Sequence, residues 1–332
     1  MCVRAAAATV VVILALVVGG GAAANPKPPL RVGMVELIGS HPGTDNIGGE
    51  FYLGFLRTAH LPGIEGRVVQ ISPLGDPVPA LEFLARQQYD VIVTPLLSLF
   101  YNQAAVARQH PHTIFLVSDV PARAKNAPPN LLVTIFRPQE SAFLAGYLAA
   151  LVEARAPRPH VVSAVGGFSI APVNVFIAGF RAGARYADPN IKVLINYSFD
   201  FTDPVKCARV ADEQIARGSG VVFNVAGACG TGALQEAKRK GAWGVGVDVD
   251  QSSLGSFVLT SVLKHVDLSI ERAVEAIRNH SYPRNGVFVF DEANGGVGIG
   301  KISPRVPRAF VRRLKRVEAA IKAGRLHVPA TL

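Results

Sequence analysis

The chain has 332 residues, 49% of them hydrophobic and 17% charged, and its formal net charge is +10. This length exceeds what one hydrophobic core usually organises, and the composition excludes a largely disordered chain, so two domains are expected. A basic surface favours acidic partners, but the basic residues are dispersed except near the C-terminus and form no groove interleaved with aromatic residues, so nucleic-acid binding is not expected.

The first 24 residues are typical of a secretory signal peptide. Arg4 precedes a short apolar run at 5–18, and Ala22-x-Ala24 offers a cleavage site. The run is too short and too poorly flanked for a membrane span. No cysteine follows it, and Cys2 stands before it, so no lipoprotein acceptor is expected. The sequence therefore predicts an exported protein, placed in the periplasm or at the outer face of the cytoplasmic membrane.

Two cysteines, Cys207 and Cys229, would remain after cleavage. An exported protein meets oxidising conditions, which makes a disulfide between them possible. The sequence alone does not show whether the two thiols meet.

The first half of the mature chain alternates strand and helix patterns. Expected strands lie at 31–37, 67–72, 89–94, 113–117 and 131–136, and expected helices lie at 47–59, from Pro77 onward, and at 98–110. Alternation at this spacing predicts a parallel sheet with right-handed crossovers. The strand at 131–136 could carry the chain between two lobes.

The same alternation then begins again. Expected helices lie at 140–153, 173–185, 204–217, 231–240 and 265–279, and expected strands lie at 160–165, 192–197, 220–225, 243–247, 257–263 and 287–290. A basic helix at 307–323 closes the chain; its charges suit a solvated face, and a docking surface is the alternative. The sequence thus predicts two α/β units of similar length.

The stretch Gly244-Val-Gly-Val-Asp-Val-Asp-Gln251 ends a buried strand in two carboxylates and an amide. In open α/β sheets, ligands bind beyond the carboxyl ends of the strands. A carboxylate held there can accept hydrogen bonds from the neighbouring hydroxyls of a ribose. The alternative is that Asp248 or Asp250 caps the following turn.

Several segments of the second half resemble one known family in order along the chain. They are Gln139-Glu-Ser-Ala-Phe-Leu-Ala-Gly-Tyr-Leu-Ala-Ala150, Gly166-Gly167, Phe176-Ile-Ala-Gly-Phe-Arg-Ala-Gly-Ala184, Tyr197-Ser-Phe-Asp-Phe-Thr-Asp203, 244–251 and Leu259-Thr-Ser-Val-Leu-Lys264. The series resembles the basic membrane protein (BMP) family, the PnrA-like purine nucleoside-binding proteins of ABC transporters.

The resemblance implies a type I periplasmic-binding-protein fold, an α/β fold of two doubly wound parallel-sheet lobes that close on a ligand around a hinge. The N-terminal lobe would hold residues 25–135 and about 261–285, and the C-terminal lobe 136–260 and about 286–332. The implied partners are a nucleoside-like small molecule and an ABC permease.

The first half matches the family less closely. The family pattern Asp-x-x-Phe-Asn places an aromatic wall at the start of the first helix. Here Asp45 fits, but Gly48 and Gly49 stand where Phe and Asn are expected. That wall would be absent or supplied by another aromatic residue (Phe51, Tyr52, Phe100 or Tyr101). Asp119, at the end of its strand, fits a ligand-binding carboxylate of the family. Asp45 and Asp119 could hold the edge of a base; loop and helix-cap roles are the alternatives.

Three further residues are expected to bind the ligand. Phe201 would stack on a base, because flat aromatic faces suit that contact; packing in the core is its alternative. Asp248 would accept the ribose hydroxyls. Lys264 would donate to a hydroxyl or pair with Asp248, although an exposed surface lysine is the alternative.

Gly227 and Gly230 lie in the glycine-rich run 226–232 and would let the backbone approach the ligand. A phosphate loop is not expected, because no G-x-x-x-x-G-K-[ST] run occurs and the nearby carboxylates would repel phosphate. Neither a metal-binding histidine spacing nor a G-x-S-x-G motif is found, so no enzyme activity and no cofactor are expected.

Two functions follow from these residues. The first is an exported solute-binding protein of an ABC importer, binding a nucleoside or a related ribosyl compound between two lobes. The second is a periplasmic ligand sensor of the same fold that docks on a membrane signalling protein.

Overall fold

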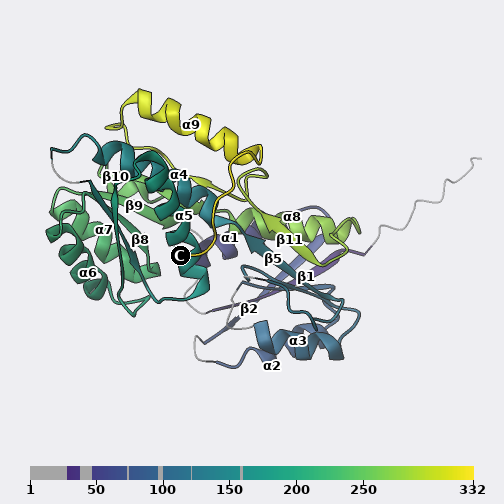
Figure 1. Cartoon of the computed structure of the whole chain (residues 1–332). Helices are drawn as coiled ribbons and strands as arrows, with labels where there is room; N and C mark the ends of the chain where they lie inside the picture. Colours follow the sequence, from purple (N-terminus) through teal and green to yellow (C-terminus); the bar gives the residue numbers. More distant parts are fainter. Residues whose placement is uncertain (1–27, 38–46, 73–74, 96–99, 121, 158–159) are drawn as a thin grey trace, which may run out of the picture.

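The computed structural model describes residues 28–37, 47–72, 75–95, 100–120, 122–157 and 160–332, and it contains two lobes side by side (Figure 1). Each lobe is built on a six-stranded sheet with helices on both faces, which confirms the predicted α/β fold class. The expected signal segment and Asp45 lie outside the described residues. Among the residues described, no helix combines the length and the apolar character needed to cross a membrane.

The first lobe has a wholly parallel sheet in the order β11-β5-β4-β3-β1-β2. Its strands are β1 (Leu30–Leu37), β2 (Ile64–Ile71), β3 (Val91–Thr94), β4 (Ile114–Val117), β5 (Leu131–Phe136) and β11 (Val287–Phe290). Helices α1 (Ile47–Ala59) and α8 (Val266–Arg278) bury one face, and α2 (Val78–Arg86) and α3 (Phe100–Gln109) bury the other. Burial on both faces explains why these strands are nearly continuous apolar runs.

The second lobe has the sheet order β12-β10-β9-β8-β6-β7, in which β12 alone runs antiparallel to its neighbour. Its strands are β6 (Val161–Gly166), β7 (Lys192–Tyr197), β8 (Val221–Val225), β9 (Trp243–Asp248), β10 (Val258–Lys264) and β12 (Val297–Ile299). One face is covered by α4 (Pro138–Glu153), α5 (Ala171–Ala187) and α9 (Arg308–Lys322), and the other by α6 (Pro204–Ala216) and α7 (Gly230–Arg239). Two short 3₁₀ turns, η2 (Gly227–Cys229) and η3 (Gln251–Leu254), follow β8 and β9.

The boundaries between the lobes differ from those expected from the sequence. The expected first-lobe segment began near 261 and ended near 285, but β10 belongs to the second sheet through Lys264 and β11 belongs to the first sheet through Phe290. The chain therefore crosses at 136–138, 264–266 and 290–297. These three crossings, which we call the hinge, are joined by hydrogen bonds from Arg137 N to Phe290 O (2.9 Å) and from His265 N to Gly296 O (3.0 Å).

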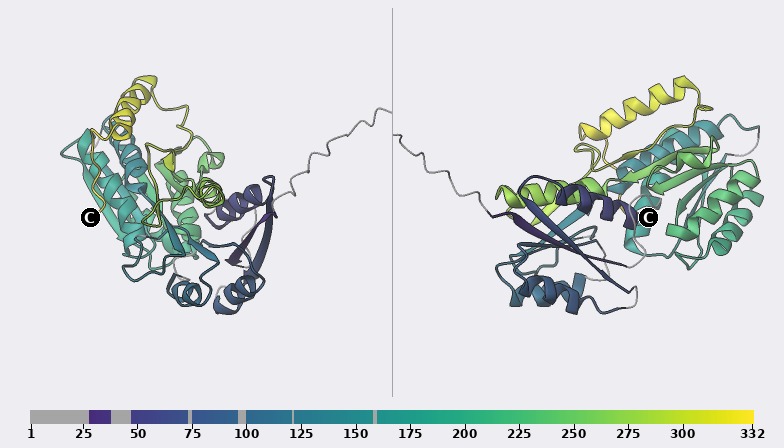
Figure 2. Two further views of the ribbon diagram at one scale, coloured as in Figure 1. Left: turned by 90° about the vertical axis from the view of Figure 1, so that its right-hand side faces the viewer. Right: turned by 180° about the vertical axis from the view of Figure 1, so that it is seen from behind.

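The closing helix α9 lies outside α4 and is drawn in yellow in Figures 1 and 2. Leu314, Val317 and Ile321 are buried against the second lobe, whereas the helix's arginines and its first lysine face outward. The amphipathic pattern that predicted this helix thus corresponds to one packed face and one basic, exposed face.

Helices α4 and α5 cross so closely that glycine is required at the contact. A Cβ atom on Gly146 would overlap the carbonyl oxygen of Phe180, and one on Gly183 would overlap that of Phe143. The segments 139–150 and 176–184 are rich in small residues. These residues therefore allow the two helix backbones to come into direct contact. This contact makes the hydrophobic face of the second lobe a tightly packed layer.

Replacing Gly183 with alanine should lower the free energy of unfolding by about 2 kcal/mol, because overpacking outweighs the roughly 1 kcal/mol by which alanine favours a helix over glycine. Urea unfolding would measure the change. Gly298→Ala is the control, since a methyl group there would meet nothing closer than 4.0 Å. Equal stability of the two variants would contradict the close crossing.

Candidate functional site

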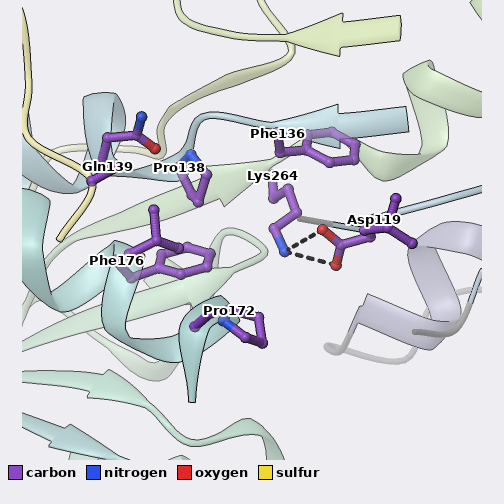
Figure 3. A pocket seen from close by; sticks show the side chains of 11 residues that line it. Asp119, Phe136, Pro138, Gln139, Pro172, Phe176 and Lys264 are labelled. Carbon is purple, nitrogen blue, oxygen red and sulfur yellow. Dashed lines mark hydrogen bonds and ion pairs between the residues drawn. The ribbon is translucent and has the colours of Figure 1, made fainter. Parts of the chain in front are cut away.

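Three charged side chains from two lobes meet between the sheets. Asp119 follows β4 of the first lobe, while Asp248 and Lys264 end β9 and β10 of the second. Lys264 Nζ donates to both carboxylate oxygens of Asp119, at 3.1 and 2.9 Å (Figure 3). It also lies 4.0 Å from Asp248 Oδ1. We call Asp119, Asp248 and Lys264 the cleft triad. Its members all lie at the carboxyl ends of parallel strands, where such sheets bind ligands.

Both carboxylates of the cleft triad occupy left-handed backbone conformations, which non-glycine residues rarely adopt. Asp248 has φ 64°, and a hydrogen bond from Val249 N to Val247 O (2.7 Å) closes a γ-turn around it. Asp119 has φ 63°, and its amide donates to Thr134 Oγ1 at 3.1 Å. Such conformations cost about 1–3 kcal/mol each and cluster at binding sites. The backbone thus aims both carboxylates into the space between the lobes.

The alternative of a turn cap belongs to Asp250 instead. Its carboxylate accepts from Ser252 N (3.1 Å) at the start of η3 and from Lys301 N (3.3 Å). No such backbone bond is found for the Asp248 carboxylate among the described residues. Asp248 and Asp250, two positions apart, therefore serve different purposes.

Burial and mutual attraction set the protonation of the triad. Only 6% of the Lys264 side chain is exposed, against 26% for Asp119 and 20% for Asp248. Burial raises the pKa of Asp248, and Asp119 adds to the rise, although Lys264 opposes it. For Lys264, burial acts to lower the pKa, but the two carboxylates outweigh it and the net direction is upward. The lysine thus stays a cation that holds two carboxylates together.

A cavity of about 310 Å³ opens beside Asp119 and Lys264. Its other walls are mainly apolar and come from the hinge, from the first turns of α4 and α5, and from the C-terminal tail: Val120, Phe136, Pro138, Gln139, Ala171, Pro172, Val175, Phe176 and Ala330. Lys264 Nζ lies 5.7 Å from the ring centre of Phe136 and 5.1 Å from that of Phe176. Gln139 is 9% exposed, and no partner is found for its Oε1 atom among the described residues. An apolar chamber with few polar groups is typical of small-molecule sites.

Three phenylalanines form an exposed group at the ends of β6 and β7. Phe168 and Phe201 are each 37% exposed and Phe199 is 68% exposed. The Phe168 ring lies 5.2 Å from that of Phe201 and 6.3 Å from that of Phe199, centre to centre. We call these three side chains the aromatic rim. Their exposure excludes the alternative that Phe201 or Phe199 packs in the core.

The local packing of the fold explains why glycine occupies positions 227 and 230. Gly227 has φ 55°, and a Cβ there would lie 3.2 Å from Phe201 O. A Cβ on Gly230 would overlap the side chain of Asn224, which is buried and bonded to Gln251 Oε1 at 3.3 Å. These contacts account for both glycines, and close approach to a ligand stays a prediction.

The structure brings together some of the residues predicted from sequence and separates others. Asp119, Asp248 and Lys264 meet, and Asp119 and Lys264 line the cavity. Asp248 and Phe201 are not among the residues that line it, and Phe201 belongs to the aromatic rim. Phe51, one candidate for a replacement wall, is buried in the core of the first lobe at 1% exposure.

Sequence reasoning missed Phe168, Phe136 and Phe176. Phe168 directly follows Gly166-Gly167 at the end of β6, so the rule that selected Phe201 would have found it. Phe136 and Phe176 lay within an expected strand and helix, where nothing marked them as facing a cleft.

Comparison with known proteins places this chain in a family. The family model described as ABC transporter substrate-binding protein PnrA-like matches residues 48–331. The nucleoside-binding protein BmpA of an ABC transporter of Lactococcus lactis is 29% identical over 233 residues, covering 65% of this chain and 64% of that protein. Basic membrane protein A2 of Borrelia garinii is 28% identical over 229 residues, covering 68% and 67%.

Solved structures agree in fold. A solute-binding protein of an ABC transporter from Aeropyrum pernix superimposes with a TM-score of 0.76 at 20% identity, covering 91% of this chain and 94% of that one. A transcriptional activator of the comK gene from Bacillus halodurans gives the same TM-score at 18% identity, covering 90% and 99%. At these identities the likeness shows the fold alone. The family match spans most of the chain, so this chain belongs to the PnrA-like family of ABC transporter substrate-binding proteins.

Proposed function

We propose that this protein binds a nucleoside or a related ribosyl compound between its lobes and delivers it to an ABC importer. The observation that carries the proposal is the cleft triad, in which two carboxylates from opposite lobes are held by one buried lysine at the carboxyl ends of parallel strands. The name of the Lactococcus relative supports a nucleoside as the ligand. Membership of a transporter family favours delivery to a permease over docking on a membrane sensor.

The chemistry of the site suits a sugar diol. The Asp248 carboxylate can accept hydrogen bonds from two adjacent hydroxyls, and Lys264 Nζ can donate to a hydroxyl oxygen. Asp119, on the other lobe, can accept from N–H groups at the edge of a base. Because these groups come from both lobes, a ligand that contacts all three would favour closure about the hinge.

The aromatic rim supplies flat faces for a base. Stacking of a base on an aromatic side chain contributes about 1–3 kcal/mol. Phe201 and Phe168 stand on the second lobe, the same lobe as Asp248 and Lys264. The base and the sugar of one ligand would therefore bind to the second lobe initially, and the first lobe would then close over both.

Replacing Asp248 with alanine should weaken binding of a nucleoside at least tenfold. The variant loses two charge-assisted hydrogen bonds of about 1.5–3 kcal/mol each, and about 1.4 kcal/mol corresponds to a factor of ten. Stability should change little or rise, since the buried carboxylate is costly without a ligand. A 2′,3′-dideoxynucleoside should bind the wild type weakly and respond little to the substitution. Calorimetric titration and thermal unfolding measure both quantities.

Asp250→Ala is the matched control for this experiment. It removes a carboxylate two residues away that caps η3, so we expect a lower melting temperature with nucleoside affinity retained. Equal loss of affinity for both ligands in Asp248→Ala would refute the diol assignment. If no nucleoside or nucleobase binds the wild type below about millimolar concentration, the proposed ligand class is wrong.

A further inference from the structure

A buried disulfide lies directly behind the aromatic rim. Cys207 is in α6 and Cys229 ends η2; their Cα atoms are 5.5 Å apart, and both residues are 0% exposed. The sequence left this pairing open, and the structure forms it. Because both cysteines are buried, the bond connects two segments inside the lobe.

One end of the disulfide holds the backbone of Phe201. The amide of Cys229 donates to Phe201 O at 3.0 Å, and Gly227, two residues earlier, lies against the same carbonyl group. The ring of Phe201 then lies on Gly167, where a Cβ would overlap its Cε1 atom. The position of this ring thus depends on η2 from one side and on the end of β6 from the other.

The other end of the disulfide holds the loop that carries Phe199 and Phe201 of the aromatic rim. Asp200 Oδ1 accepts from Thr202 N (2.7 Å) and from Asp203 N (3.0 Å), and Asp203 caps α6 by accepting from Val205 N (2.9 Å). This chain of hydrogen bonds makes the loop 199–203 continuous with the first turn of α6, which contains Cys207. Phe199 lies in that loop with φ 57°, and its amide donates to Gly167 O at 2.8 Å.

We infer that the Cys207–Cys229 disulfide positions the aromatic rim for stacking, and so sets the affinity for ligands that carry an aromatic ring. This inference rests on the proposed function for the ligand class. The bond fastens η2 and the start of α6 on either side of the loop 199–203, so the Phe201 ring is presented in one place before a ligand arrives. Pre-organisation of this kind strengthens binding because less ordering remains to be done on association.

A disulfide also stabilises a protein generally, by restricting the unfolded chain. The two roles differ in what is lost when the bond is removed. General stabilisation predicts that all amides of the second lobe exchange faster together. Positioning predicts a further, local increase in the exchange rate of amides in the loop 199–203 and in η2. It also predicts weaker binding of ligands that carry an aromatic ring.

The test compares Cys207→Ala/Cys229→Ala with Val221→Ala. Alanine suits the apolar surroundings of the two cysteines. Val221 is fully buried at the opposite end of β8 from η2, so its truncation destabilises the same lobe away from the rim. Hydrogen–deuterium exchange of the unliganded proteins is followed at 199–203 and 227–230, and guanosine and adenosine affinities are measured by calorimetry.

We expect exchange in these two segments to be at least tenfold faster in the double variant than in Val221→Ala, after correction for global stability. Nucleoside affinity should fall by about fivefold to a hundredfold in the double variant only, the range that corresponds to losing one base–aromatic stack. Exchange that rises only in step with global stability, or an unchanged affinity, would overturn the inference. Because the exchange measurement uses no ligand, it still decides the positioning if no nucleoside binds.

Gly227→Ala keeps the disulfide and provides a second test if the double variant fails to fold. The added methyl group would lie 3.2 Å from Phe201 O at a backbone conformation that favours glycine, and so would displace Phe201. Affinity for guanosine and adenosine should fall at least fivefold. Wild-type affinity in a folded Gly227→Ala variant would show that the position of Phe201 does not affect nucleoside binding, which would contradict the inference.

Discussion

Replacing Glu292 with glutamine should raise the free energy of unfolding by about 3 kcal/mol at pH 8. Glu292 is 2% exposed in the hinge, and its Oε2 atom has no partner among the described residues. Burial is the main reason that its pKa rises from 4.5 to about 7; Glu318 and Glu140 add to the rise, and Lys322, at 3.6 Å, opposes it. Glutamine has nearly the same shape and carries no charge to bury.

The sign of the pH dependence follows from the raised pKa. An acid that binds its proton more tightly when folded stabilises the protein below its unfolded pKa, and this contribution is lost as the pH rises to about 7. The advantage of the glutamine variant should therefore appear between pH 4.5 and 7 and shrink below about 1 kcal/mol at pH 4.5. Urea unfolding at several pH values measures it.

Glu318→Gln is the matched control for Glu292→Gln. Glu318 also pairs with Lys322, but 25% of its side chain is exposed, against 2% for Glu292. The control should keep a pH dependence of the same sign, made smaller because Glu318 is one cause of the raised pKa of Glu292. A glutamine variant of Glu292 whose gain is the same at pH 4.5 and pH 8 would show that an uncharged packing effect, and not proton binding, is responsible.

Replacing Lys264 with methionine should lower the free energy of unfolding by about 3 kcal/mol at pH 7 and abolish tight nucleoside binding. Methionine keeps an apolar stem beside Phe136 and Phe176 but leaves Asp119 and Asp248 facing each other without a cation. Breaking a buried ion pair by removing one partner typically costs about 3–5 kcal/mol. The lower end applies here, because 26% and 20% of the two carboxylate side chains remain exposed.

The double variant Asp119→Asn/Lys264→Met separates charge from packing. Neutralising one carboxylate should recover part of the stability, so the two substitutions should not be additive. The loss in Lys264→Met should also diminish as the pH falls, because burial raises the pKa of Asp248 and its carboxylate takes up a proton. Additive effects, or a loss that is constant from pH 4 to pH 8, would mean that the lysine contributes by packing alone.

The sequence predicted the strand and helix pattern well, because each strand is buried on both faces and therefore forms a distinct apolar run. Helix α1 at 47–59 and strand β7 at 192–197 match their expected bounds. The short strand β12 was missed, since three residues carry too little pattern. The lobe boundaries were displaced because β10 and β11 are both apolar strands, and nothing in their residues says which sheet they join.

The candidate site was predictable in part, because a polar side chain that ends a buried strand is visible in the sequence. This rule selected Asp119, Asp248 and Lys264, which do meet. It could not show that Lys264 pairs more closely with Asp119 than with Asp248, since that contact joins residues 145 positions apart on different lobes. The sequence likewise could not show that Phe201 lies outside the lining of the cavity, because this depends on the tertiary arrangement of loops.

The three chain crossings also bear on how this protein is made. The first sheet acquires its edge strand β11 only at residues 287–290, and α8 packs on α1 across some two hundred intervening residues. Most of the second lobe is thus synthesised before the first can be completed. A newly made chain would hold an unfinished first lobe with the edge of β5 unpaired, a template for misassociation. Cutting the gene between the lobes at residue 136 would therefore yield a first half that lacks a strand and a helix, rather than an independent domain.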